Sequence, residues 1–409
     1  MKTNLFPVNE PRRISSLNNE ARPGTDTASS FIIRHSALLL VRLAGLGLLS
    51  KCVARAALTL WLMVAAASLW AADFPGAQWA TATPAEVGLD EVKLLEARDY
   101  ALTGGGAGCI VRGCRLVFSW GDLKQRFDLK STTKSFGAAA LGLSIADGKL
   151  RLEDKAASLH PTFGTPPGEN GSTGWLKDIT IRHLASQTAG FDKPGGYEPL
   201  LFPPGTEWAY SDGGPNWLAE CITLAYRRDL DELMFERVFN PLGIQRSDLV
   251  WRRNAYRPDL IEGIKRREFG SGISANVDAM ARFGLLWLRG GEWNGKCILP
   301  REFVDQVRTT SPGVPGLPVR KPDEYGRASS HYGLLWWNNA DAALEGVPSD
   351  AYWTWGLYDS LIVVLPSLDI VVARAGQSWK RTPAADHYEV LKPFFQPIVA
   401  AARSTNNPP

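Results

Sequence analysis

Ser131-Thr132-Thr133-Lys134 opens an Ala/Leu-rich run, TTKSFGAAALGLSIAD at 132–147, which Gly148 closes. This composition and the closing glycine predict a helix that begins at or near Ser131. Residues three positions apart lie on one face of a helix, so the Lys134 amine can reach the Ser131 hydroxyl. A neutral amine there could remove the hydroxyl proton and create a nucleophile, beside N–H groups that favour negative charge. Because Ser-x-x-Lys alone is a weak signal, the surrounding sequence must support it.

Composition and charge exclude a nucleic-acid partner. The chain has 409 residues and is 45% hydrophobic, enough for a large core. Residues 1–72 hold eight Lys/Arg and three Asp/Glu, net +5, whereas the remaining 337 residues hold 37 and 39, net −2. The overall excess of +3 therefore belongs to the N-terminal segment, and the globular part has no basic field.

Residues 1–72 are predicted to be a leader that carries a signal peptide or a membrane anchor. Ala56–Ala72 is an uncharged apolar run that follows Lys51 and Arg55, and it ends in small residues that suit a signal peptidase. Its 17 residues are also at the short limit for a spanning helix, so an uncleaved anchor remains an alternative. We expect export to the periplasm or medium, with membrane contact only through this segment.

The cysteines and histidines predict neither a disulfide framework nor a metal site. Cys109 and Cys114 flank a hairpin turn at Arg112-Gly113, and in that register Cys109 faces Arg115 or Leu116. A disulfide between the two cysteines would be poorly placed. No cysteine or histidine spacing matches a metal site.

Strand-like segments occur at both ends of the globular part, with helical segments between them. The predicted elements are a helix at 84–102, a hairpin at 107–111 and 114–119, the helix after Ser131, a tight hairpin at Asn294-Gly295, strands at 332–337, 360–365 and 370–373, and a terminal helix at about 383–402. The order predicts an α+β fold: one antiparallel sheet flanked by the N- and C-terminal helices, with an inserted mostly helical region. Residues 73–409 would form one domain, with its α/β part at about 84–130 and 292–409 and its helical part at about 131–291.

Two further segments supply groups that an acylated serine needs. The loop FPPGTEWAYSDG at 202–213 presents Tyr210, and a tyrosine near a lysine ammonium can have a lowered pKa and accept the serine proton. The segment Trp353-Thr354-Trp355-Gly356-Leu357 precedes a strand. A glycine there lets the backbone come close to a substrate carbonyl.

The order of hairpin, Ser-x-x-Lys helix, Pro-Gly-Thr-x-x-x-Tyr-Ser loop and glycine turn before two final strands resembles the serine β-lactamase-like hydrolases. The most similar members are the class C β-lactamases and their esterase and 6-aminohexanoate-dimer hydrolase relatives. The resemblance covers about Pro84 to Gln396. It includes Ile179–Gly190 and Ser271–Gly291, which are similar to the family's corresponding helical stretches.

The resemblance implies a role for each of these residues. Ser131 would be the nucleophile, Lys134 the amine that activates it, and Tyr210 the shared base and acid. The backbone N–H groups of Ser131 and Leu357 would form the oxyanion hole, with Gly356 giving access. Acylation of Ser131 by a small ester or amide would be followed by hydrolysis, without a metal or cofactor.

Two departures from the family pattern bear on the substrate. Where the family often has Tyr-x-Asn, this chain has Tyr210-Ser211-Asp212, so an amide donor becomes an acceptor-only carboxylate. Thr354-Trp355-Gly356 replaces Lys-Thr-Gly or His-x-Gly, and the missing cation weighs against substrates that carry a carboxylate. The predicted substrate-binding residues are Asp212, Thr354, Trp355, Gly356 and Tyr358, and the predicted aromatic rim consists of Trp208, Trp353, Trp355 and Tyr358.

Plainer interpretations stay open for several of these residues. Asp212 can simply cap the helix that follows it. Tyr210 can be a packed core phenol, and tryptophans are more often core than rim. His183, in an apolar helical stretch, is predicted to be structural.

The leading functional hypothesis is an exported serine hydrolase of carboxylic esters or simple amides. One alternative is a β-lactamase or D-alanyl carboxypeptidase that binds the substrate carboxylate with Arg320 or Arg374. The other is a catalytically silent member of the family that binds a ligand.

Overall fold

The computed structural model describes residues 74–381 and 387–403. The predicted leader and the start of the predicted terminal helix lie outside these ranges. Among the described residues, no helix combines the length and the apolar composition needed to cross a bilayer.

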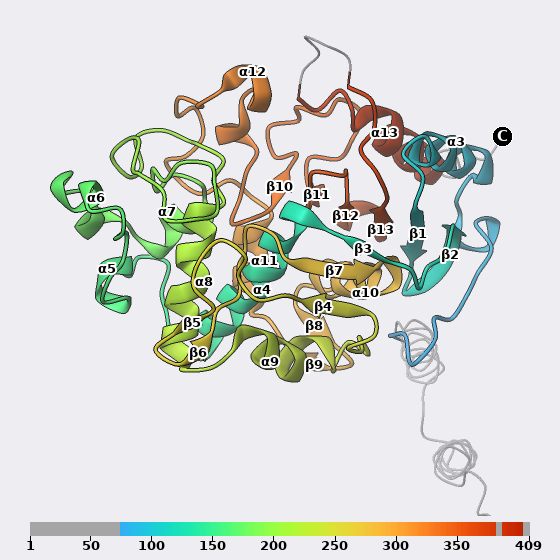
Figure 1. The fold of residues 1–409 in the computed structure, drawn as a ribbon. Coiled ribbons are helices and arrows are strands. Elements are labelled where there is room, and N and C mark those ends of the chain that lie inside the picture. Colours follow the sequence, from blue (N-terminus) through green and yellow to red (C-terminus); the bar gives the residue numbers. More distant parts are fainter. Residues whose placement is uncertain (1–73, 382–386, 404–409) are drawn as a thin grey trace, which may run out of the picture. The chain divides into compact units, whose positions relative to one another are not determined.

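Six strands form the central antiparallel sheet: β1 (Ala107–Arg112), β2 (Arg115–Trp120), β10 (Trp337–Asn338), β11 (Tyr352–Trp353), β12 (Leu361–Leu365) and β13 (Ile370–Ala375). Their order is β10-β11-β12-β13-β1-β2 (Figure 1). β1 pairs with β13 over its whole length, from Ala107 opposite Ala375 to Arg112 opposite Ile370. The N-terminal hairpin thereby completes a sheet whose other strands come from the C-terminal part of the chain.

Helices cover both faces of this sheet, which explains why β12 and β13 are buried at every position. Ile370 and Val372 belong to the core shared with α3 (Glu91–Leu102) and α13 (Lys392–Arg403). Val371, on the opposite face, belongs to the core shared with α10 (Val277–Leu288). Figure 1 shows α3 and α13 side by side, as their mutual packing requires. The predicted α+β fold, with terminal helices flanking an antiparallel sheet, is confirmed.

The inserted region holds short helices around two longer ones, α4 (Thr133–Ala146) and α8 (Gly213–Tyr226), which pack together. The other helices here are α5 (Ala156–Leu159), α6 (Glu169–Ser172), α7 (Ile181–Ala185) and α9 (Leu230–Met234), followed by a π-helical turn at Phe235–Phe239. A small sheet of β3 (Arg126–Asp128), β7 (Ile273–Asn276) and β4 (Leu249–Trp251) lies beside them, in the order β3-β7-β4. The other strands form two hairpins, β5 (Leu260–Ile261) with β6 (Ile264–Lys265) and β8 (Glu292–Trp293) with β9 (Lys296–Cys297). Two further α-helices, α11 (Arg301–Val307) and α12 (Pro322–Tyr325), and short 3-10 turns complete the described fold.

Two local predictions are confirmed. The tight hairpin at Asn294-Gly295 is β8–β9. His183 is structural, because it completes a capping box with Thr180 at the start of α7. The register predicted for the first hairpin is wrong: a bulge between Ile110 and Val111 places Cys109 opposite Ser119 instead of Arg115 or Leu116. In the described ranges the cysteines form no disulfide.

Other boundaries differ from the prediction, for local reasons. The strand predicted at 332–337 is wrong for most of its length, because Leu335 has φ +64° and turns the chain so that only β10 pairs. The helix predicted at 84–102 breaks at Gly88 (φ +68°), and α3 begins after Asp90, whose side chain caps it. Finally, α10 lies in the segment predicted to belong to the helical part, yet it packs on the six-stranded sheet.

The close approach of α10 to the sheet depends on Gly284 and gives a stability prediction. A Cβ at Gly284 would lie 2.6 Å from a methyl of Ile362 and 2.6 Å from a methyl of Val371. Gly284→Ala should lower the free energy of unfolding by about 1–3 kcal/mol through overpacking, even though alanine has the higher helix propensity. Gly171→Ala in α6, where a Cβ meets nothing within 4 Å, is the matched control and should be neutral. Urea denaturation compares the two, and a Gly284→Ala protein as stable as the parent would contradict the packing argument.

Candidate active site

Ser131 lies in a 3-10 turn, Lys130–Thr132, that leads directly from β3 into α4. The turn is fastened to β7 on both sides: the Leu129 N–H donates to the Ile273 carbonyl at 2.9 Å, and the Ile273 N–H donates to Thr133 Oγ1 at 3.1 Å. Ser131 is therefore held just before the helix N-terminus, as its sequence position predicts. Its side chain is partly exposed.

Lys134 is buried, with 1% of its surface exposed, and its ammonium has three acceptors. Nζ donates to Ser131 Oγ at 3.1 Å, to the Gly270 carbonyl at 2.9 Å, and to Asp212 Oδ1. An ammonium has three protons and no lone pair. All three protons are engaged here, so Lys134 acts toward Ser131 as a hydrogen-bond donor in this arrangement.

Tyr210 lies beside both residues, although 76 positions separate it from Lys134 in the sequence. The Lys134 ammonium is 4.8 Å from the centre of the Tyr210 ring, and the Ser131 side chain lies close enough to the Tyr210 phenol to affect its pKa. Burial raises the pKa of Tyr210 well above its usual value, the Asp212 carboxylate adds to the rise, and the neighbouring Ser131 hydroxyl offsets part of it. The phenol therefore keeps its proton in the resting site.

Two sets of contacts hold Tyr210 in place. Its ring stacks on Tyr325 and Trp337, with centroid distances of 5.4 and 5.8 Å. The loop that carries it is clamped by Gln187, whose side chain accepts from the Ser211 N–H at 2.9 Å and donates to the Ser211 carbonyl at 3.0 Å. Gln187 belongs to the stretch 179–190, which resembles a helical stretch of the family.

Asp212 precedes α8 but makes no capping hydrogen bond with its side chain. The plainer interpretation, that it only caps this helix, is therefore wrong. Its carboxylate contacts Lys134 through Oδ1, and its Oδ2 lies 3.7 Å from the ammonium of Lys193. A Cβ at Gly270 would lie 2.8 Å from Asp212 Cβ, so only glycine lets the Gly270 carbonyl reach Lys134. The Asp212 carboxylate thus forms ion pairs with both Lys134 and Lys193.

The two N–H groups predicted to form the oxyanion hole are available. Within the described ranges, neither the Ser131 nor the Leu357 N–H donates a hydrogen bond. The role of Gly356 differs from the expected one, because a Cβ there would lie 2.1 Å from the Leu129 carbonyl oxygen. Ser360 strengthens the same contact by donating from Oγ to that oxygen at 2.7 Å. Gly356 therefore lets the turn before β12 pack directly against the turn that carries Ser131.

The predicted aromatic rim is largely wrong. Trp208 and Trp353 are fully buried, and Trp355 is almost so, with its indole N–H donating to Asp359 at 2.8 Å. Thr354 is also buried: its hydroxyl accepts from the Ile362 N–H at 2.8 Å, so its side chain serves the β11–β12 hairpin instead of a substrate. Within the segment 353–358, Leu357 is 65% exposed and Tyr358 is partly exposed, and the other four residues are buried.

Of the two arginines considered as carboxylate partners, Arg374 is excluded. It is fully buried and donates to backbone carbonyls, among them those of Tyr358 at 2.7 Å and Gln377 at 2.8 Å. Burial lowers the pKa of Arg374 to about 10. Arg320 lines a cavity of about 380 Å³ that adjoins Tyr210, where it pairs with Glu207 at 2.9 Å.

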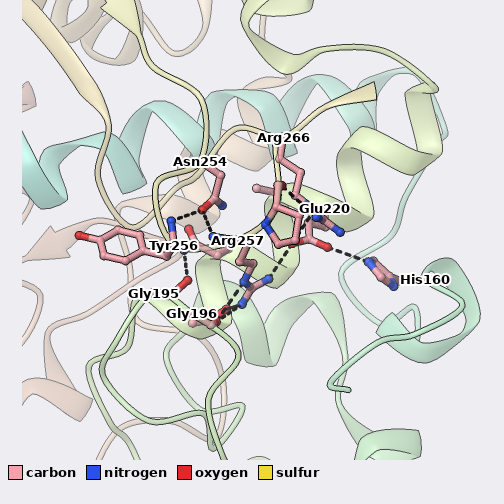
Figure 2. Close-up of polar contacts among 12 residues, drawn as sticks. His160, Gly195, Gly196, Glu220, Asn254, Tyr256, Arg257 and Arg266 are labelled. Atoms are coloured by element: carbon pink, nitrogen blue, oxygen red, sulfur yellow. Dashed lines mark hydrogen bonds and ion pairs between the residues drawn. The ribbon is translucent and has the colours of Figure 1, made fainter. Parts of the chain in front are cut away.

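A buried charged network holds the loops around α8 (Figure 2). Arg257 donates to Glu220 at 2.8 Å and to the carbonyls of Gly196 and Gly213, and Glu220 also binds His160 at 2.9 Å. Burial opposes ionisation of Glu220, but the His160 hydrogen bond and the Arg257 charge outweigh it and lower the pKa of Glu220. The network ties the loop after β4 and the loop before Tyr210 to the helix that follows Asp212.

Glu268 is a second buried acid near the site, fully enclosed and paired with Arg252. Burial raises its pKa to about 7; Arg252 opposes this rise, and the Asp212 carboxylate adds to it. Neither this group nor Gly270 nor Lys193 was predicted from the sequence, because none of them belongs to a recognisable motif.

The fold and the arrangement of serine, lysine and tyrosine define the class of serine β-lactamase-like hydrolases. The family model named Beta-lactamase matches residues 90–392, and the chain belongs to this family of acyl-transferring serine hydrolases.

Three solved structures show the same fold. A putative beta-lactamase from Bacteroides dorei is 16% identical, with a TM-score of 0.60 over 78% of this chain and 100% of that one. A putative 6-aminohexanoate-dimer hydrolase from Bacillus anthracis is 17% identical, with a TM-score of 0.55 over 75% and 82%. EstCE1, a hydrolase with promiscuous acyltransferase activity, is 17% identical, with a TM-score of 0.55 over 76% and 98%.

The pKa of Glu268 predicts a pH-dependent stability. A glutamate ionises near pH 4.5 when the chain unfolds but only near pH 7 in the folded protein, so the folded state binds the proton more tightly in between. The free energy of unfolding should fall as the pH rises through this window and then level off. Glu268→Gln, which stays neutral, should remove this decline and be more stable than the parent at pH 8 by about 3 kcal/mol, with little difference at pH 4.5. Urea denaturation at several pH values tests this, and parallel pH curves for the two proteins would refute it.

Proposed function

We propose that the protein is an exported serine hydrolase that cleaves carboxylic esters or simple amides through an acyl-enzyme on Ser131. The observation that carries this proposal is one set of contacts: the Lys134 ammonium donates to Ser131 Oγ at 3.1 Å and lies 4.8 Å from the centre of the Tyr210 ring. Membership of the family supports an acyl transfer. Export rests on the apolar segment Ala56–Ala72 alone, and N-terminal sequencing of the secreted chain would test it.

In the first step Ser131 Oγ attacks the substrate carbonyl carbon, and the carbonyl oxygen becomes an oxyanion. The free N–H groups of Ser131 and Leu357 are the donors that would stabilise it, and such donors are typically worth about 3 kcal/mol each. The Lys134 ammonium stabilises the charge that develops on Oγ, because it donates to that atom throughout.

The proton leaves Ser131 through Tyr210. Because the resting phenol is protonated, Tyr210 accepts the serine proton on Oη as it gives its own proton to the leaving oxygen or nitrogen. The bond from the carbonyl carbon to the leaving group then breaks. In the second step a water attacks the acyl carbon, its proton passes to Tyr210, and the Tyr210 proton returns to Ser131 Oγ.

The groups around the nucleophile favour a simple ester or amide over a β-lactam. The position where β-lactamases and penicillin-binding proteins carry a cation is Thr354, which is buried. Arg374, the other candidate for pairing a carboxylate near the reacting carbonyl, is enclosed. The names of two structural neighbours, a putative 6-aminohexanoate-dimer hydrolase and a hydrolase with acyltransferase activity, agree with ester or amide chemistry.

The proposal is tested with two chromogenic substrates. We expect purified protein to hydrolyse 4-nitrophenyl valerate with a kcat/KM at least tenfold above that for a chromogenic cephalosporin, and Ser131→Ala to hydrolyse neither. Faster cephalosporin turnover would favour the β-lactamase alternative. Ester turnover that is unchanged in Ser131→Ala would reject the nucleophile, and no turnover of either substrate would favour a silent, ligand-binding member of the family.

A further inference from the structure

A second lysine, Lys193, approaches the site from the loop that follows Phe191. Its ammonium lies 4.4 Å from the centre of the Tyr210 ring and 3.7 Å from Asp212 Oδ2, a long ion pair. Lys134 holds the other oxygen of the same carboxylate at closer range. Lys193 thus shares the Asp212 carboxylate with Lys134. Within the described ranges, most of the N–H donors of the Lys193 ammonium have no acceptor.

Lys193 lines the cavity of about 380 Å³ that adjoins Tyr210. The cavity has an apolar wall of aromatic and aliphatic side chains: Phe191, Leu201, Ala209, Tyr210 and Tyr325. Its charged lining consists of Asp192, Lys193, Glu207, Arg320 and Lys321. A ligand that fits here would have an apolar body and a polar or charged end.

The acidic groups around the cavity are committed to other partners. Glu207 pairs with Arg320 at 2.9 Å, and Asp192 Oδ1 accepts the backbone N–H of Lys193 at 2.7 Å. Glu324 lies outside the lining, and its charge acts on both Lys193 and Tyr325. The lining keeps a net positive charge, and Lys193 is its cation nearest to Tyr210.

Lys193 is only partly buried. About a third of its side chain is exposed, and burial lowers its pKa in spite of the Asp212 carboxylate. An anion that enters the cavity would therefore find a partly desolvated cation with free N–H donors.

We propose that this cavity binds a carboxylate at the far end of the substrate and that Lys193 is the residue that recognises it. The inference rests on the proposed function and narrows its substrate class to esters or amides whose acyl or leaving part has an apolar body ending in a carboxylate. The cation absent at position 354 is thus supplied from a different loop, at a site farther from the reacting carbonyl.

The test compares matched esters that differ in one terminal charge. 4-Nitrophenyl glutarate monoester and 4-nitrophenyl valerate place the difference on the acyl side, and 3-carboxyphenyl acetate and phenyl acetate place it on the leaving side. For at least one pair, the ratio of kcat/KM for the charged ester to that for the neutral ester should be at least tenfold lower in Lys193→Met than in the parent. Lys193→Arg should keep the ratio within threefold. A general loss of rate that arises from the contacts of Lys193 with Asp212 and Tyr210 lowers kcat/KM for both esters equally. It therefore leaves the ratio unchanged.

Lys296→Met is the matched control, because Lys296 is an exposed lysine in the remote β8–β9 hairpin, and its ratios should equal those of the parent. Unchanged ratios in Lys193→Met for both pairs would overturn the inference while leaving the proposed function intact. A parent protein that hydrolyses no ester would reject both. If Lys193→Met does not fold, inhibition of the parent decides: valerate should inhibit ester hydrolysis at least tenfold more strongly than the uncharged valeramide does, and equal inhibition would reject the carboxylate site.

Discussion

The buried ammonium of Lys134 is the constraint on which the site depends. A charged group that is 1% exposed is tolerable only if it is fully paired, and Lys134 meets this requirement with three acceptors from three separate segments. These are the nucleophile's turn, the residue before α8, and the loop before β7. Pairing the lysine therefore brings together segments that are about 78 and 136 positions away from it in the sequence.

Small residues bring the six-stranded sheet into contact with the turn that carries Ser131. Gly356 allows the turn before β12 to touch the Leu129 carbonyl, and Ser360 donates to that oxygen while its own carbonyl accepts from Thr132 at 2.7 Å. The Ser131 and Leu357 N–H groups thus sit on two turns that contact each other. The proposed oxyanion site would therefore depend on packing between the sheet and the start of α4.

The balance of charge around Tyr210 decides how the proton moves. A phenol next to an ammonium is expected to be acidic, which is what the sequence suggested. Burial, and after it the Asp212 carboxylate, shift its pKa in the opposite direction. Asp212, at a position where the family often has an amide, thus helps to keep the phenol protonated, as the proposed proton relay requires.

The sequence allowed the architecture and the central residues to be predicted, because these carry local or ordered signals. The i, i+3 spacing predicted the contact between Ser131 and Lys134. The order of the motifs predicted the architecture. Contacts made by backbone atoms, such as the Gly270 carbonyl, leave no residue-type signature, and Lys193 occurs in an ordinary turn. The buried positions of Trp208 and Trp353 depend on tertiary packing, and the failed strand at 332–337 on the left-handed conformation of Leu335.

Covalent labelling with a fluorophosphonate probe, followed by mass spectrometry of the Ser131 peptide, tests most directly whether the three side chains act as one unit. The parent protein should be labelled at Ser131, Ser131→Ala should not be labelled, and Tyr210→Phe, which keeps the ring stack but loses the relay oxygen, should be labelled about 10²–10⁴-fold more slowly. Equal labelling of the parent and Ser131→Ala, or a Tyr210→Phe rate equal to that of the parent, would contradict the account.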